Sequence, residues 1–336
     1  MVEQGALIRA LMTPQAYPHH PATVEMVQTQ MSFVFLTGDY VYKVKKPVDL
    51  GYLDYTTLEK RRHMCQQEVV LNRRLCPDVY LDVVPITERS GMLSIGGEGG
   101  AAIEYAVRMR QLPRDRTMDQ LLKTNQVSRQ MVEQVARILA RFHHDAETSE
   151  TIAAYGDINI IVTNAEENFT QTQKYTGATI SQKQYEAISH YTRDFIESNA
   201  PMFRKRMNEG RIRDCHGDLH AAHICFTDGI CIFDCIEFNE RFRYCDVANE
   251  VAFLAMDLDY HRRPDLSQRF VEAYVAASGD DEMLRLLSFY KCYRAYVRGK
   301  VEGFKLDDPF VPAEEKIKAR AAAQRYFGLA ASYVSQ

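Results

Sequence analysis

The sequence has no apolar run long enough to cross a lipid bilayer. Its 336 residues are 46% hydrophobic and 26% charged, which is the balance of an ordinary soluble globular chain. The ~18 consecutive apolar residues that a spanning helix requires occur nowhere. The N-terminus carries Glu3 and an apolar stretch broken by Arg9, a pattern that does not match a signal peptide. We therefore expect a cytoplasmic protein without a membrane partner.

The sequence also lacks a strong excess of charge of either sign. Forty-one Lys and Arg residues stand against 45 Asp and Glu residues, for a formal net charge of -4. A protein that binds nucleic acid electrostatically is normally strongly basic, so we expect no nucleic-acid partner. Short basic runs such as residues 60–62 are typical of solvated faces.

Cysteine is sparse and no CxxC pair is present. Eight cysteines in 336 residues are too dilute for a disulfide scaffold, and without export we expect all of them to stay reduced. Cys225, Cys231, Cys235 and Cys245 are clustered in the sequence. Structural zinc usually takes closely spaced ligand pairs, so buried free thiols on strands are the favoured interpretation.

The distribution of apolar residues divides the chain into two parts. The first contains β-branched and aromatic runs at 23–30, 32–39, 40–48, 80–89 and 101–112, with a helical pattern at 57–75. The second is helical at 129–147, at 183–209 and from about 246 to 335, with a hairpin centred on residues 228–229. This order predicts an α+β fold with a small β-rich N-lobe over residues 1–110 and a larger helical C-lobe over residues 111–336.

The segment HGDLHAAH at 216–223 carries the clearest chemical signal. It matches the protein-kinase catalytic loop H-R-D-L-x-x-x-N at its His, Asp and Leu. Sixteen residues after Asp218, the apolar strand ICIF ends in Asp234. In such a pair, one carboxylate aligns the acceptor hydroxyl and takes its proton, and the other holds the Mg²⁺ that bridges the phosphate oxygens of the nucleotide. We predict Asp218 as the catalytic residue and Asp234 as a metal ligand.

The N-terminal part contributes a lysine and a glutamate in the order that a kinase uses. Lys43 and Val41 lie on the same face of an expected strand, as the Lys and Ala of V-A-I-K do. We predict that Lys43 reaches the α- and β-phosphates, that Val41 packs on the adenine, and that Glu68 on the following helix pairs with Lys43. Lys45 and Lys46 compete with Lys43 for this role.

Weaker signals indicate the rest of a nucleotide site. Ser32 lies where a loop over the phosphates is expected, although residues 28–32 contain no glycine and also suit an ordinary hairpin. The backbone of Arg108, Met109 and Arg110 lies at the junction of the two lobes, where a connector offers the donor and acceptor that the edge of adenine requires.

A family resemblance rests on these motifs. HGDLH followed by an Ile-Phe-Asp strand resembles the aminoglycoside phosphotransferase and choline-kinase-like branch of the protein-kinase-like fold, in which HGD replaces HRD. A closer resemblance, to a family of uncharacterised bacterial phosphotransferase-like proteins, lies in YVYKVKKPV, DYTTLEKRR, EVVLNRRL and FDCIEFNERFRYCDVANEVAFLAMDLDY. The similarity spans about residues 25–260 and implies a bilobal fold and the use of ATP.

The resemblance also implies partners and supporting residues. Some members of the family carry a C-terminal P-loop ATPase domain. The sequence contains no GxxxxGK[ST] motif, so we expect that domain to be absent, with a separate P-loop ATPase as a candidate protein partner. The family's structural Asp that braces the catalytic loop corresponds to Asp246. Glu237 either assists the metal or hydrogen-bonds its loop, and the second is the favoured interpretation.

One position departs from the family pattern. Where that pattern has Asn as a second metal ligand, this chain has His223, and imidazole suits manganese or zinc better than Mg²⁺. The predicted function is an ATP- and Mg²⁺-dependent phosphotransferase acting on a hydroxyl of a small molecule, with Mn²⁺ as an alternative ion. His223 keeps open a nucleotide-binding pseudokinase, or a nucleotidyl transferase, that regulates a partner protein. A third interpretation is a metallohydrolase built on His216, Asp218, His220 and His223, but their spacing does not match the HExxH helix motif and they lie in an expected loop.

Overall fold

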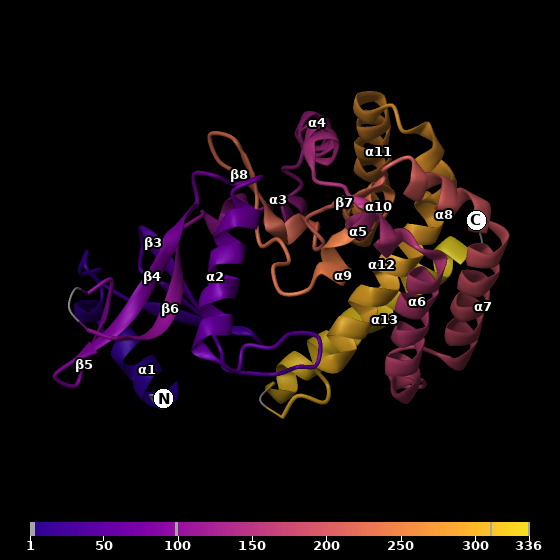
Figure 1. The fold of residues 1–336 in the computed structure, drawn as a ribbon. Helices are drawn as coiled ribbons and strands as arrows, with labels where there is room; N and C mark the ends of the chain where they lie inside the picture. The colour runs from indigo at the N-terminus through magenta and orange to yellow at the C-terminus, as the bar shows by residue number, and fades with distance from the viewer. Residues whose placement is uncertain (1–3, 98–99, 310, 335–336) are drawn as a thin grey trace. The chain divides into compact units, whose positions relative to one another are not determined.

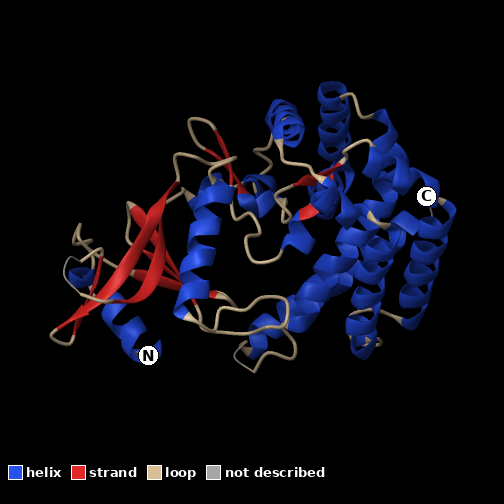
Figure 2. Cartoon of the chain, viewed as in Figure 1, coloured by secondary structure: helices blue, strands red, loops and turns tan. Residues whose placement is uncertain are grey.

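The computed structural model describes residues 4–97, 100–309 and 311–334. The chain forms two compact units: Met1–Thr117 with His223–Glu240, and Met118–Ala222 with Arg241–Gln336. Figure 2 shows extended strands mainly in the first unit and helices mainly in the second, which confirms the α+β fold class. The segment that carries Asp234 groups with the N-terminal residues, although the sequence boundary at residue 110 assigned it to the C-lobe.

The first unit is built on a sheet whose six described strands are all paired antiparallel, in the order β1-β2-β3-β6-β4-β5. Five of them were expected from the sequence, and β5 was not, because it is an edge strand of only four residues. The strand bounds are β1 Glu25–Gln28, β2 Ser32–Leu36, β3 Tyr40–Lys45, β4 Tyr80–Arg89, β5 Met92–Ile95 and β6 Ala102–Arg110.

Helix α2 (Leu58–Asn72) lies along this sheet (Figure 1). It begins at Thr57, whose side chain caps the helix by accepting a hydrogen bond from the Lys60 N–H. Cys65 and Val69 of α2 share an apolar cluster with the sheet residue Val107. Glu68 lies on this buried face with no exposed surface, so the packing of α2 carries a carboxylate into the first unit's core.

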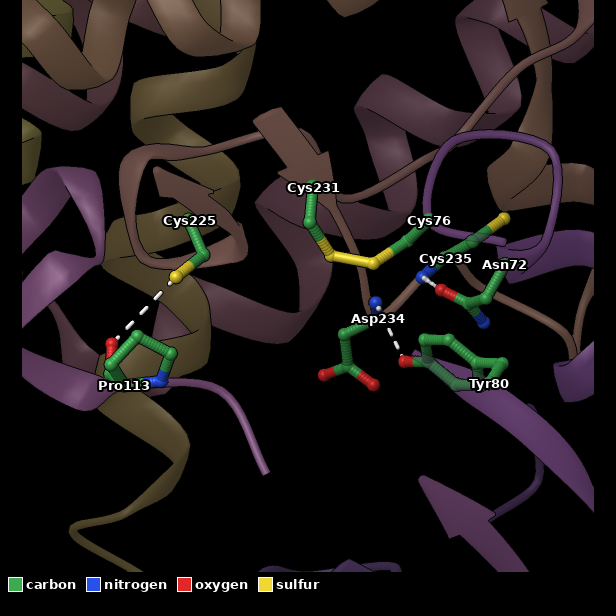
Figure 3. Close-up of a disulfide and its surroundings, with 8 residues drawn as sticks. All are labelled: Asn72, Cys76, Tyr80, Pro113, Cys225, Cys231, Asp234 and Cys235. Atoms are coloured by element: carbon green, nitrogen blue, oxygen red, sulfur yellow. Dashed lines mark hydrogen bonds between the residues drawn. A yellow bond between two sulfur atoms is a disulfide. The ribbon is translucent and has the colours of Figure 1, made fainter. Parts of the chain in front are cut away.

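A short hairpin returns to the first unit late in the sequence. Its strands are β8 (Ile224–Phe226) and β9 (Ile230–Ile232), as the sequence predicted. The cysteine prediction was wrong at one pair, because Cys231 of β9 forms a disulfide with Cys76, with Cα atoms 4.8 Å apart (Figure 3). The two cysteines are 155 residues apart in sequence, so no local spacing could reveal the pair. The other six cysteines, all within the described residues, are buried free thiols.

The second unit is helical around α10 (Val247–Tyr260), most of which is buried. Figure 1 shows α12 (Leu284–Phe304) and α13 (Ala313–Val334) running side by side within this unit. A two-stranded sheet pairs β7 (Ile212–Asp214) with β10 (Tyr244–Asp246).

No helix in the described part of the chain is both long and apolar enough to span a membrane. The remaining helices are α1 Gln4–Leu11, α3 Met118–Lys123, α4 Arg129–Asp145, α5 Glu150–Ala153, α6 Ile158–Thr172, α7 Gln182–Ser198, α8 Ala200–Asn208, α9 Glu240–Arg243 and α11 Pro264–Ser278.

Candidate active site

Lys43 of β3 lies between two carboxylates of the first unit. Its Nζ is 2.8 Å from Glu68 Oε1 on α2 and donates a hydrogen bond of 2.8 Å to Asp234 Oδ1, which follows β9. Three segments that are distant in the sequence therefore meet at one ammonium group. The Lys43 side chain remains 17% exposed, so part of it is accessible to a ligand.

Lys45, two residues further along β3, also contacts Glu68. Its Nζ lies 2.7 Å from Glu68 Oε2 and also pairs with Glu237. Glu237 Oε1 accepts a hydrogen bond of 2.7 Å from the Tyr55 hydroxyl. Because Lys45 is only 1% exposed, it is committed to these buried partners. Lys46 points to the other face of the strand, where its Nζ donates to the Thr29 carbonyl.

The charges in this cluster hold one another ionised. Burial alone would lower the pKa of Lys43, but Asp234 and Glu68 raise it well above its ordinary value. Burial would raise the pKa of Glu68, and the two lysines instead hold it below its ordinary value. The buried charges are therefore stable because they are paired, and loss of one partner would leave an uncompensated charge.

Asp234 is held in a backbone conformation that L-residues rarely adopt. Its φ is 63°, and its N–H donates to the Tyr80 hydroxyl at 3.1 Å (Figure 3). The next N–H, of Cys235, donates to Asn72 Oδ1 at 2.8 Å. These contacts fix the turn after β9, and the Asp234 carboxylate remains 42% exposed. Positive φ at a non-glycine residue costs about 1–3 kcal/mol and is concentrated at functional sites.

His223 lies beside this carboxylate. Its Nε2 is 3.5 Å from Asp234 Oδ2. The structure thus brings the two predicted metal ligands together in the first unit. A carboxylate oxygen suits Mg²⁺, and an imidazole nitrogen suits a softer divalent ion such as Mn²⁺. The donor set fits a divalent cation held by Asp234 with His223 as a second ligand.

The catalytic loop of the second unit runs from β7 to a single 3₁₀ turn at Ala221–His223. Gly217 has a φ of 86°, a conformation that favours glycine and turns the chain immediately before Asp218. The Asp218 N–H donates to His216 Nδ1 at 3.3 Å. Asp218 Oδ2 lies 3.6 Å from Nε2 of His220. His216 therefore orients the loop backbone, as expected of a structural histidine.

The loop is braced by Glu250 rather than by Asp246, so the prediction for Asp246 was wrong. Glu250 Oε1 accepts hydrogen bonds from the N–H groups of His216 and Gly217, at 2.8 and 2.6 Å. Asp246 instead caps α10 through the Ala248 N–H and binds Arg206 through both of its carboxylate oxygens. The four-residue offset corresponds to about one helical turn.

The other residues that the sequence predicted to bind nucleotide differ in their contacts. Val41 and Met109 are paired in register between β3 and β6 and share one apolar cluster. Arg108 donates from Nε and Nη2 to the two carboxylate oxygens of Asp82, and the N–H of Arg110 donates to the Val79 carbonyl. Ser32 is 1% exposed and closes a hairpin turn with Thr29. The side chains at 41 and 109 thus join an apolar surface, whereas the Arg108 side chain and the backbone N–H groups of Ser32 and Arg110 already have partners.

Two supporting residues were missed in the sequence. Tyr80 contacts the backbone of Asp234, and Glu250 holds the catalytic loop. Glu250 carried a usable signal, since an acid within the apolar run VANEVAFLAM requires a buried partner. Tyr80 had none, because an aromatic residue at the start of a strand is unremarkable.

The comparisons with known proteins agree with this geometry. The sequence profile of the phosphotransferase enzyme family matches residues 111–289, more than half of the chain. The chain belongs to this family. Uncharacterised proteins of Mycobacterium tuberculosis and Mycobacterium bovis are 31% identical over 320 residues, covering 94% of this chain and 61% of each relative. The chain therefore spans less than two thirds of the length of these relatives.

Solved structures of the same fold include two phosphotransferase-like proteins. A choline/ethanolamine kinase family protein from Mesorhizobium loti has a TM-score of 0.53 at 11% identity, covering 98% of this chain and 99% of that protein. A presumed aminoglycoside phosphotransferase from Ralstonia eutropha has a TM-score of 0.51 at 14% identity, covering 98% of both chains. These likenesses confirm the kinase-like fold that the resemblance implied.

Proposed function

We propose that this chain is an ATP- and Mg²⁺-dependent phosphotransferase that phosphorylates a hydroxyl group of a small molecule. The observation that carries the proposal is the placement of Lys43 within 2.8 Å of both Glu68 and Asp234. A strand lysine paired with a helix glutamate, next to a metal-binding aspartate, is the arrangement with which kinases hold nucleotide phosphates. Membership of the phosphotransferase family supports the same chemistry and favours it over a metallohydrolase.

In this proposal the residues of the first unit bind the nucleotide. Lys43 binds phosphate oxygens, and Glu68 holds its ammonium group in place. Val41 and Met109 offer an apolar surface for the adenine. The N–H groups of Arg110 and Gln111 already donate to Val79 and Asp39. We therefore assign the adenine edge to the backbone after Gln111, rather than to residues 108–110.

The residues of the second unit position the acceptor. Asp218 accepts the proton of the attacking hydroxyl, and Glu250 keeps its loop rigid through two backbone hydrogen bonds. Asp234 and His223 would hold a divalent ion, which would supply positive charge for the phosphoryl group that is transferred. A cytoplasmic location and a separate P-loop ATPase as a protein partner remain parts of the proposal.

The proposal predicts different losses for the two aspartates. Asp218→Asn should retain Mg-ATP affinity and lose transfer by about a hundredfold or more, because only proton acceptance and alignment are removed. Asp234→Asn should lose both Mg-ATP affinity and phosphoryl transfer. Calorimetry with Mg-ATP and a radiolabelled transfer assay over a panel of metabolites measure the two quantities.

Asp228→Asn is the matched control, because Asp228 is exposed in the nearby β8–β9 turn. It should behave as wild type in both assays. Equal turnover by wild type and Asp218→Asn would show that Asp218 is not the base.

A nucleotide-binding pseudokinase is the second candidate, and the position of His223 favours it. The imidazole takes the place of an oxygen ligand 3.5 Å from Asp234, which weakens the match to Mg²⁺. Binding of nucleotide without turnover under Mg²⁺ or Mn²⁺ would support this candidate. Transfer to any acceptor under either ion would exclude it.

A further inference from the structure

Helix α12 presents two arginines, four residues apart, on the side of the catalytic loop. Arg294 Nη1 donates to the Gly217 carbonyl at 3.2 Å, and its Nε donates to Asn249 Oδ1 at 2.7 Å. Its guanidinium also lies 4.5 Å from the centre of the Phe253 ring. Arg294 is only 7% exposed, so its donors hold the loop that carries Asp218.

Arg298 follows one helical turn later, on the same face of α12. Its side chain is partly exposed, and its guanidinium lies 5.6 Å from the centre of the Tyr326 ring. Its Nε is buried and has no hydrogen-bond partner within the described part of the chain. Buried donors of this kind are rare and require an explanation, such as a bound ion or ligand.

The surroundings of Arg298 connect it to the catalytic carboxylate. Burial lowers the pKa of its guanidinium, but Tyr326, Asp218 and Asp257 raise it above the ordinary value. Asp257 accepts a hydrogen bond of 2.8 Å from the Ala221 N–H at the end of the catalytic loop. Arg298 therefore lies in the electrostatic environment of Asp218, on the helix that Arg294 fastens to the loop.

Lys291, three residues before Arg294 on α12, already has partners. Lys291 Nζ donates to Asp259 Oδ2 at 2.9 Å and to the Ser267 hydroxyl at 3.0 Å. Lys291 and Arg294 thus have structural partners, whereas Arg298 is hydrogen-bonded to Tyr326 and its Nε has no partner within the described part of the chain. A guanidinium recognises planar or tetrahedral anions through its fixed fork of donors.

We propose that the acceptor carries an anionic group, a carboxylate or a phosphate, in addition to the hydroxyl that receives the phosphoryl group, and that Arg298 binds this anion. The inference rests on the proposed phosphotransferase function and names its substrate class. It separates this chain from kinases whose acceptors are cationic amines, because a cationic acceptor would be repelled by Arg298.

The test compares acceptors that share a skeleton and differ in charge. The first set is glycerate, glycerol phosphate, glycerol and aminopropanediol, which carry a carboxylate, a phosphate, no charge and an amine. Larger hydroxyl compounds follow, each tested with the same four groups. Each is assayed for binding by calorimetry in the presence of a non-hydrolysable ATP analogue, and for transfer from radiolabelled ATP. The proteins are wild type, Arg298→Gln, Arg298→Lys and the control Arg285→Gln, an exposed arginine on the same helix.

The expected result is that wild type prefers anionic members by about tenfold or more over their neutral and amino counterparts. Arg298→Gln should lose that preference, Arg298→Lys should keep part of it, and Arg285→Gln should keep all of it. All four proteins should bind Mg-ATP equally. The carboxylate and phosphate members show which anion is preferred.

Two results would overturn the inference while the phosphotransferase function stands. One is Mg-ATP binding and transfer without any preference for the anionic members. The other is a preference that survives Arg298→Gln, which would reduce Arg298 to a counter-charge for Asp218 and Asp257. Loss of Mg-ATP binding in the wild-type protein would refute the proposed function and this inference together.

Discussion

His223 is the residue at which the loop departs from the kinase motif H-R-D-L-x-x-x-N, and its Nε2 lies 3.5 Å from Asp234 Oδ2. We expect His223→Asn to retain or increase transfer with Mg²⁺ and to reduce the advantage of Mn²⁺ by about threefold or more, because an amide oxygen suits the harder ion. The measurement is the ratio of kcat/KM with each ion. His190→Asn, on an exposed histidine of α7, is the control. An unchanged ratio would mean that His223 is not a ligand.

The side-chain amine of Lys300, on α12, has a lowered pKa. Its Nζ donates to Asn168 Oδ1 at 2.6 Å and to Gln171 Oε1 at 2.9 Å, and burial lowers its pKa to about 8. In the NMR spectrum of the reductively methylated protein, we expect one lysine signal to titrate near pH 8. This signal should be absent from the spectrum of Lys300→Arg. The unfolded chain holds this proton up to about pH 10.5, so the site's contribution to stability rises between pH 8 and 10.5. A spectrum in which every lysine titrates near 10.5 would contradict the assignment.

At the scale of elements, α10 and α4 together support the catalytic loop. Glu250 Oε2 lies 2.8 Å from His143 Nε2, and His143 Nδ1 is 2.7 Å from the Tyr274 hydroxyl. The chain of contacts therefore continues from α11 through α4 and α10 to the backbone of His216 and Gly217. All of these side chains are buried, so no water replaces a lost partner.

We expect Glu250→Gln to lower kcat by about tenfold or more while Mg-ATP affinity stays unchanged. The substitution removes the charge from an acceptor of two backbone N–H groups, worth about 1.5–3 kcal/mol for each such bond, whereas the nucleotide residues Lys43 and Asp234 belong to the other unit. Steady-state kinetics and calorimetry separate the two effects. Glu315→Gln, on an exposed residue of α13, is the control. Parallel losses of kcat and nucleotide affinity would point to general unfolding instead.

At the scale of the whole molecule, the first unit is closed by a covalent link across the sequence. The disulfide from Cys76 to Cys231 encloses residues 118–222 of the second unit within its loop. It joins the chain after α2, which carries Glu68, to the strand that precedes Asp234. Asn72 and Tyr80 make hydrogen bonds to the same strand end, so the link reinforces contacts that already exist (Figure 3).

We expect a reducing agent to lower the stability of the protein by about 2–4 kcal/mol, because a disulfide that closes a long loop restricts the unfolded chain. Cys76→Ser should have the stability of the reduced wild type and should not respond to the reducing agent. Thermal and urea unfolding with and without dithiothreitol provide the measurement. Cys292→Ser, at a buried free thiol, should lower stability by an amount that the reducing agent does not change. Equal stability of oxidised and reduced wild type would argue against the link.

Much of the candidate site was predictable because its residues lie in local patterns. Lys43 is placed by strand alternation after Val41, and Asp218 and Asp234 each follow a short motif that a kinase loop shares. The ion pair between Lys43 and Glu68 also occurs in the structure. The functional roles of these residues stay predictions until the assays above are made.

Several features could not be read from the sequence, because they depend on which side chains meet after folding. Lys45 was only a competitor for the lysine role, and the structure shows it buried between Glu68 and Glu237. Asp246 and Glu250 are both acids near the start of one helix, and only packing decides that Glu250 contacts the loop. Hydrogen-bond partners over 30 residues away leave no local trace in the sequence.

The sequence by itself determined the α+β class, the order of most strands and helices, and the motifs that carry the chemistry, since these depend on periodicity and on short-range turn geometry. The tertiary structure alone decided that Cys76 meets Cys231 and that the segment with Asp234 groups with the N-terminal unit. It also decided that Arg294 holds the Gly217 carbonyl, whereas Arg298 Nε has no hydrogen-bond partner within the described residues. The reason is physical: strand and helix patterns are local properties of the chain, whereas the pairing of buried charges and thiols is set by packing between segments far apart in sequence.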